Sequence, residues 1–81
     1  MQLNNMKKIT IYSTPTCHYC DMAKSFFDAK GLKYVVHNVS TDLAKRKEMI
    51  IKSDQMGVPV IIIGDTILVG FDADKVEEAL K

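Results

Sequence analysis

The run Val60-Ile61-Ile62-Ile63 restricts the possible folds of this chain more than any other feature. A strand with one face in water alternates apolar and polar residues, whereas this run carries β-branched side chains on both faces. It is typical of a strand that is covered on both sides. Pro59 precedes the run and Gly64-Asp65 follows it, which predicts a β-hairpin with a second strand at 66–69.

The other elements follow from periodicity and from start and stop signals. The predicted strands cover 7–12 and 33–39, and the predicted helices cover 18–30, 41–53 and 73–80. Gly31 is expected to stop the first helix, and Asp72 is expected to cap the last. Ser40 or Thr41 would cap the middle helix.

The element order, βαβ followed by ββα, defines an α/β domain. The crossover helix makes the first two strands parallel, because such connections are right-handed. A four-stranded sheet with helices on both faces follows. The middle helix adds a modest apolar side of Leu43, Met49 and Ile50, and its charged side, 45–48, is expected to be a solvated face. A chain of 81 residues has room for one such domain, expected at 7–81 behind a flexible leader at 1–6.

The composition excludes several classes of function. Hydrophobic residues make up 47% and charged residues 26%, as in globular domains, and no uncharged run is long enough for a membrane span. The 11 basic and 10 acidic residues are mixed along the chain, so nucleic acid is not an expected partner. The N-terminus lacks the apolar core of a secretory signal, which predicts a cytoplasmic protein without a lasting structural disulfide.

The two cysteines, Cys17 and Cys20, form a CxxC within the stretch TPTCHYC. The predicted helix begins near Cys17, where unpaired N–H groups and the helix dipole stabilise an anion. Cys20 lies one turn deeper on the same face, with its Cα roughly 5 Å away, a distance that a disulfide can span. This spacing predicts a redox pair in which Cys17 attacks a substrate disulfide and Cys20 resolves the mixed disulfide.

Two other interpretations of these cysteines stay open. They could be buried residues that only pack, or they could bind a metal. A structural zinc site needs about four ligands, and the histidines available to complete it are His18 and His37, which lie in different predicted elements. An iron–sulfur cluster or a copper ion held through Cys17 and Cys20 is the alternative from another functional class.

Three separated segments, IYSTPTCHYC, GVPVIII and VGFDADKVEEAL, resemble the glutaredoxins and glutaredoxin-like redoxins of the thioredoxin fold. The resemblance implies a mixed sheet of order 2-1-3-4 with its third strand antiparallel to the first. It also implies a thiol–disulfide oxidoreductase that reduces protein or glutathione mixed disulfides. Such an enzyme needs no tightly bound cofactor and uses glutathione as co-substrate.

The resemblance also assigns site residues. Tyr19 matches the Tyr of the family's Cys-Pro-Tyr-Cys, and Val58-Pro59 match its Val-Pro, whose proline is cis and whose preceding residue offers backbone hydrogen bonds. Asp72 falls where the family holds the glutathione amino group, and it is equally an N-cap. The residues expected to line the substrate and glutathione groove are Thr14, Tyr19, Gln55, Gly57, Val58, Pro59, Gly70, Phe71 and Asp72.

The departures from the family pattern fall on glutathione contacts. Thr14 stands where many members have Lys, Met56 where a basic residue is common, and Gly57 where the Thr of Thr-Val-Pro stands, so two carboxylate anchors are missing. Gly70-Phe71 resembles a segment of redoxins that accept electrons from thioredoxin reductase, some of which serve ribonucleotide reductase. The electron donor, glutathione or thioredoxin reductase, therefore stays open. The expected partners are disulfide-containing proteins, and the expected state is a monomer.

His18 replaces the proline that the family places between its cysteines. It is either a first-turn residue with its ring in solvent or a group that stabilises the Cys17 thiolate. A more stable thiolate would make the redox couple more oxidising.

Overall fold

The structure, a computed structural model, describes residues 7–81. The expected leader at 1–6 lies outside the described residues. The elements in chain order are β1 (Ile9–Ser13), α1 (His18–Ala29), β2 (Val35–Asn38), α2 (Leu43–Ser53), β3 (Val60–Ile63), β4 (Thr66–Val69) and α3 (Ala73–Leu80). This is the predicted βαβαββα order.

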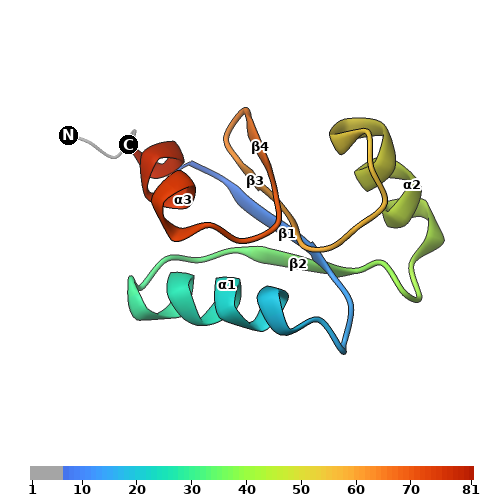
Figure 1. Ribbon diagram of the computed structural model, residues 1–81, viewed down its shortest axis with the longest axis horizontal. Coiled ribbons are helices and arrows are strands. Elements are labelled where there is room, and N and C mark those ends of the chain that lie inside the picture. The colour runs from blue at the N-terminus through green and yellow to red at the C-terminus, as the bar shows by residue number, and fades with distance from the viewer. Residues whose placement is uncertain (1–6) are drawn as a thin grey trace.

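The strands form one four-stranded mixed sheet of order β2-β1-β3-β4 (Figure 1). β1 pairs with β2 in parallel, in register Thr10 to Val35, and β1 pairs with β3 antiparallel, in register Ile11 to Ile61. β3 and β4 form the antiparallel hairpin that Gly64-Asp65 predicted. The sheet order and strand directions that the sequence implied are confirmed.

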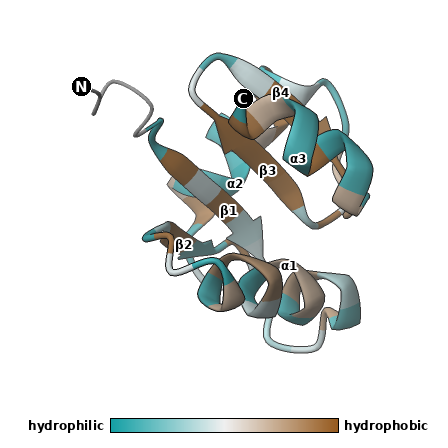
Figure 2. Cartoon of the chain, turned by 90° about the vertical axis from the view of Figure 1, so that its left-hand side faces the viewer, coloured by the Kyte–Doolittle hydropathy of each residue, from teal (hydrophilic) through white to brown (hydrophobic). Residues whose placement is uncertain are grey.

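β3 is buried on both faces, as its continuous apolar run predicted. Ile61 and Ile63 pack with residues of α1 and α3, whereas Val60 packs with Met49 of α2 on the opposite face. Alternate residues of a strand point to opposite faces, so one short run serves two cores. In Figure 2 β3 is the continuous brown strand at the centre of the molecule, and in Figure 1 α2 lies well apart from α1 and α3.

The start of α2 differs from the prediction. Its N-cap is Asp42, whose carboxylate accepts the Lys45 N–H at 3.0 Å. The hydroxyls of Ser40 and Thr41 are engaged by Asn38 instead: the Ser40 hydroxyl donates to the Asn38 side chain at 2.6 Å, and the Thr41 hydroxyl donates to the Asn38 carbonyl at 3.4 Å. Because Asn38 captures both residues in a turn at the end of β2, the capping position passes to Asp42.

α2 is attached to the sheet by apolar packing, in which Met49 and Ile50 take part, and by a polar contact. Met49 is fully buried, while Leu43, which was expected on the apolar side, is 70% exposed in the first turn. The buried Tyr12 hydroxyl of β1 donates to the Glu48 carboxylate. Burial, followed by this bond and the charge of Glu48, raises the pKa of Tyr12. The bond from Tyr12, reinforced by Lys45, lowers the pKa of Glu48.

Candidate redox site

The redox pair lies where the chain passes from the end of β1 into the start of α1. After the buried Ser13 the chain turns, and the Cys17 N–H donates to the Thr14 carbonyl at 3.3 Å. Cys17 is the N-cap of α1, with φ −88° and ψ 109°, so it lies just outside the first turn in which it was expected. It is half-buried, while Cys20 is fully buried in the first turn.

The two sulfur atoms are joined in a disulfide, and the Cα atoms are 5.2 Å apart. The Cys20 N–H also donates to the Cys17 sulfur at 3.1 Å. Cys17 therefore uses its sulfur as an N-cap acceptor, in the place where Ser or Asp oxygens usually satisfy a free N–H group. The same N–H group and the positive end of the helix dipole favour negative charge on Cys17 in the reduced protein.

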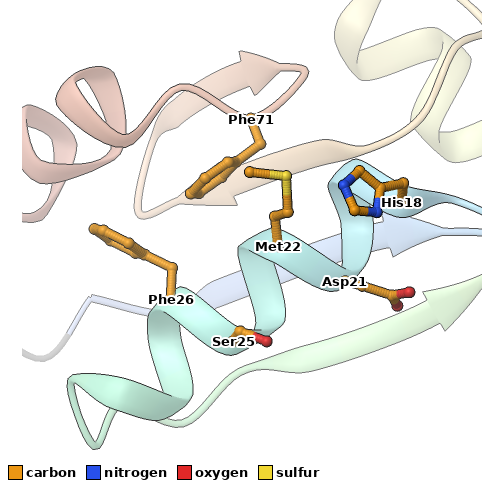
Figure 3. Close-up of a pocket in the computed structure, with 6 residues that line it drawn as sticks. All are labelled: His18, Asp21, Met22, Ser25, Phe26 and Phe71. Atoms are coloured by element: carbon orange, nitrogen blue, oxygen red, sulfur yellow. The ribbon is translucent and has the colours of Figure 1, made fainter.

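His18 and Tyr19 lie between the cysteines and are both exposed, with ring centroids 5.8 Å apart. His18 borders an apolar groove of about 480 Å³ along α1. Figure 3 shows the groove: Phe71 reaches down from the segment before α3 toward Met22, and Phe26 lies further along the helix. The Phe26 and Phe71 rings meet edge to face at 5.5 Å.

A second groove, of about 380 Å³, runs between the Val58–Pro59 loop and the start of α3. The Val58–Pro59 peptide bond is cis, as the resemblance implied, and Pro59 is fully buried. The Gly70 N–H donates to the Pro59 carbonyl at 2.8 Å and ties this loop to the end of β4. The groove brings together most of the expected site residues: Tyr19, Val58, Pro59, Gly70, Phe71 and Asp72, together with Val69 and Lys75.

A third groove, of about 330 Å³, lies on the other side of Val58. Its lining includes the expected Thr14 and Gly57, and also Arg46 of α2, which was not among the expected groove residues. The charged face of α2 was expected to be solvated. The signal was present, because Arg46 lies three residues before the buried Met49 and therefore shares the helix side that faces the sheet. Thr14 and Met56 stand where many family members have basic residues. Arg46 supplies a basic group beside these two positions.

Two expected groove residues are engaged in local hydrogen bonds. Asp72 is the N-cap of α3, where its carboxylate accepts the N–H groups of Asp74 and Lys75 at 3.0 and 3.4 Å. Gln55 lines neither groove beside Val58; its side-chain amide is bonded to the backbone of Gly57. Asp72 therefore combines a capping role with a place in the groove, whereas Gln55 acts on the loop.

Across residues 7–81, no three His, Cys, Asp or Glu side chains gather closely enough to hold a metal ion. Over the same residues, none of the helices has the length and apolar character to cross a membrane.

A CxxC at a helix start, with its first cysteine half-buried and its second fully buried, together with a cis-proline loop on a β2-β1-β3-β4 sheet, defines a redox protein of the thioredoxin-like fold. Comparison with known proteins gives the family. The glutaredoxin family model matches residues 9–68, and the chain belongs to the glutaredoxin family.

Two curated relatives illustrate its place there. An uncharacterized glutaredoxin-like 8.6 kDa protein in the rubredoxin operon of Clostridium pasteurianum is 41% identical over 73 residues, covering 90% of this chain and 97% of that protein. Glutaredoxin 3 of Escherichia coli K12 is 36% identical over 67 residues, covering 83% of this chain and 81% of that protein.

Solved structures agree with the fold. The thioredoxin-like protein BC3987 superposes with a TM-score of 0.83 at 26% identity, covering 89% of this chain and 99% of that one. The glutaredoxin-like NrdH-redoxin of Escherichia coli, described as having a thioredoxin-like activity profile, gives 0.76 at 27% identity, covering 88% and 92%. A buckwheat glutaredoxin in complex with glutathione gives 0.70 at 28% identity, covering 95% and 71%.

Proposed function

We propose that the protein is a dithiol thiol–disulfide oxidoreductase in which Cys17 is the nucleophile and Cys20 the resolving cysteine. The observation that carries the proposal is the asymmetry of the pair. Cys17 is half-buried at the helix N-cap with an N–H group on its sulfur, while Cys20 is fully buried one turn deeper. A substrate can reach only the first sulfur, and the second is held ready beside it.

The exchange balances in two steps. The Cys17 thiolate attacks one sulfur of a substrate disulfide, a mixed disulfide forms, and the other substrate sulfur leaves as a thiolate. The Cys20 thiolate then attacks the Cys17 sulfur, which forms the Cys17–Cys20 disulfide and releases the second substrate thiol. The substrate gains two electrons and the protein loses two. The 5.2 Å Cα separation supports ring closure without backbone movement.

The test is a comparison of Cys17→Ser with Cys20→Ser. Cys17→Ser should abolish the reduction of protein and glutathione mixed disulfides. Cys20→Ser should accumulate a mixed disulfide between Cys17 and the substrate, detectable by mass spectrometry. Full dithiol activity in Cys17→Ser, or trapping at Cys20 in the wild type, would overturn the assignment.

We propose glutathione as the electron donor, because the two grooves that meet at Val58 offer complementary charges. Arg46 lines one groove, and Asp72 with Lys75 lines the other. Glutathione carries carboxylates at both ends and an ammonium group at one of them, so Arg46 suits the glycine carboxylate and Asp72 the ammonium group. Two glutathione molecules would reduce the Cys17–Cys20 disulfide and leave as oxidised glutathione. Such a donor fits a cytoplasmic monomer.

A matched pair of variants tests the Arg46 contact. Arg46→Gln should raise the KM for a glutathione mixed disulfide about fivefold, which corresponds to roughly 1 kcal/mol. Lys47→Gln removes the same charge from the next position of α2, which is exposed and lines neither groove, and should leave KM unchanged. Equal effects of the two variants would indicate a general charge effect and would count against the contact.

The apolar groove beside His18 supports a second candidate, in which a protein reductase is the donor. Met22, Phe26 and Phe71 form a surface that glutathione does not need and that the apolar side chains of a protein partner would cover. Oxidised protein supplied with NADPH and either glutathione plus glutathione reductase or thioredoxin reductase distinguishes the donors. Reduction only by thioredoxin reductase would remove the glutathione proposal.

A further inference from the structure

The segment between α2 and β3 is held by a short series of local hydrogen bonds that begins in the core. The fully buried Met49 presents its carbonyl to the Ser53 hydroxyl at 2.7 Å, and the same hydroxyl lies 3.1 Å from the Gln55 carbonyl. Asp54 turns the chain there with a left-handed φ of 60°. The turn brings the Gln55 side chain back along the loop that follows.

The Gln55 amide holds both backbone groups of Gly57. Its Nε2 donates to the Gly57 carbonyl at 2.9 Å, and its Oε1 accepts the Gly57 N–H at 2.7 Å. The orientation of both peptide groups of Gly57 is therefore set by one side chain. The next residue is Val58, which lines the grooves on both sides of it.

Gly57 and Gln55 depend on each other for space. A Cβ atom at position 57 would lie 3.0 Å from Gln55 Oε1, and within 4 Å it would meet only the Gln55 side chain. The glycines with a positive φ are Gly31, Gly64 and Gly70. Gly57 is therefore not required by its backbone conformation. It is required because the Gln55 amide occupies the place that a side chain would take.

We propose that Gln55 is a positioning residue that fixes the peptide edge at Gly57–Val58 against which the substrate lies, and that Gly57 serves to admit it. The proposal rests on the proposed function, since it assumes that the disulfide substrate binds along Val58. In this role Gln55 acts on the loop and does not touch either sulfur atom of the redox pair. Its loss should weaken substrate binding and leave the reactivity of Cys17 as it is.

The experiment compares Gln55→Ala, Gly57→Ala and the double variant with the wild type, and uses Lys47→Ala as a control on the exposed side of α2. Each is assayed for kcat and KM with a disulfide between glutathione and a cysteine-containing peptide, and for the alkylation rate of reduced Cys17. Gln55→Ala should raise KM about five- to thirtyfold, the range expected for one or two hydrogen bonds. The kcat and the alkylation rate should change less than twofold.

The double variant carries the sharper test. Gly57→Ala should raise KM by a similar factor because its methyl group displaces the amide, and the double variant should be no worse than either single one. If the KM of the double variant rose by the product of the two single-variant factors, the proposal would be overturned. A fall in kcat and alkylation rate at unchanged KM, which indicates only general loosening, would also overturn it.

One readout does not depend on activity. The Gly57 amide proton should exchange slowly in the wild type and Lys47→Ala, and at least tenfold faster in Gln55→Ala. An unchanged exchange rate would overturn the claim that the Gln55 amide holds Gly57. If the exchange rate responds as expected while the wild type fails to reduce the disulfide, the positioning of Gly57 by Gln55 is supported, and it is the proposed function that has failed.

Discussion

Replacing Asp72 by alanine and by asparagine should separate its two roles, the capping of α3 and the binding of substrate. Its carboxylate accepts two backbone N–H groups, at 3.0 and 3.4 Å, at the start of an eight-residue helix. The same side chain lines the groove that Tyr19 also lines. Alanine removes both the capping oxygen and the charge, whereas asparagine keeps an oxygen for the cap and removes only the charge.

The magnitudes follow from the cap. Losing an N-cap oxygen costs about 1 kcal/mol, and losing a negative charge at a helix N-terminus costs about 0.3–1 kcal/mol. Asp72→Ala should therefore destabilise the protein by about 1–2 kcal/mol and Asp72→Asn by at most about 1 kcal/mol. In a domain of this size each kcal/mol lowers Tm by about 4–8 °C. The alanine variant should melt at a clearly lower temperature than the asparagine variant.

The binding role predicts a different order. If the charge holds the ammonium group of glutathione, both variants should raise the KM for a glutathione mixed disulfide equally, by about fivefold for an ion pair of roughly 1 kcal/mol. Thermal unfolding by circular dichroism and steady-state kinetics measure the two effects. A wild-type Tm in Asp72→Ala would refute the capping argument, and a wild-type KM in Asp72→Asn would refute the binding argument.

Four further predictions concern other parts of the molecule. His18→Pro should make the reduction potential more negative, by about 30 mV for each tenfold loss of thiolate stability; a redox titration with an unchanged or less negative potential contradicts this. Burial holds the pKa of Tyr12 above its ordinary 10.0, so the folded state keeps a proton that the unfolded chain loses, and stability falls as pH rises above about 10. Urea midpoints against pH should show a smaller alkaline loss in Tyr12→Phe, and an equal loss refutes the assignment. The pKa of Glu48 lies below its ordinary 4.5, so Glu48→Gln should cost stability at pH 7 and progressively less on acidification. Phe27→Ala, at a fully buried position, should cost about 3–5 kcal/mol in urea unfolding, and a cost below about 1 kcal/mol would count against its place in the core.

The element order could be predicted because its signals are local. The continuous run of β3 requires cover on both faces, and Gly64-Asp65 and Asp72 mark a turn and a helix start wherever the chain folds. The start of α2 could not be predicted in the same way. Ser40, Thr41 and Asp42 are all good caps, and Asp42 takes the role because the hydroxyls of Ser40 and Thr41 are bonded to Asn38.

The candidate site also has features that could be predicted from the sequence and features that could not. Most of the expected groove residues line one groove, whereas Thr14 and Gly57 line the groove on the other side of Val58. Gln55 is turned onto Gly57, and Arg46 enters from the charged face of α2, which was expected to be solvated. Spacing places Arg46 on the side of α2 that faces the sheet, but it does not bring Arg46 to the Val58 loop or turn Gln55 onto Gly57. Each placement depends on how the end of α2 approaches the loop before β3.

The sequence alone determined the redox pair and its scaffold, because a CxxC at a helix start and a doubly buried strand are properties of neighbouring residues. Only the tertiary structure decided which side chains surround the pair. The grooves on either side of Val58 are assembled from segments far apart in the chain, and their charge depends on which faces of α2 and α3 those segments meet.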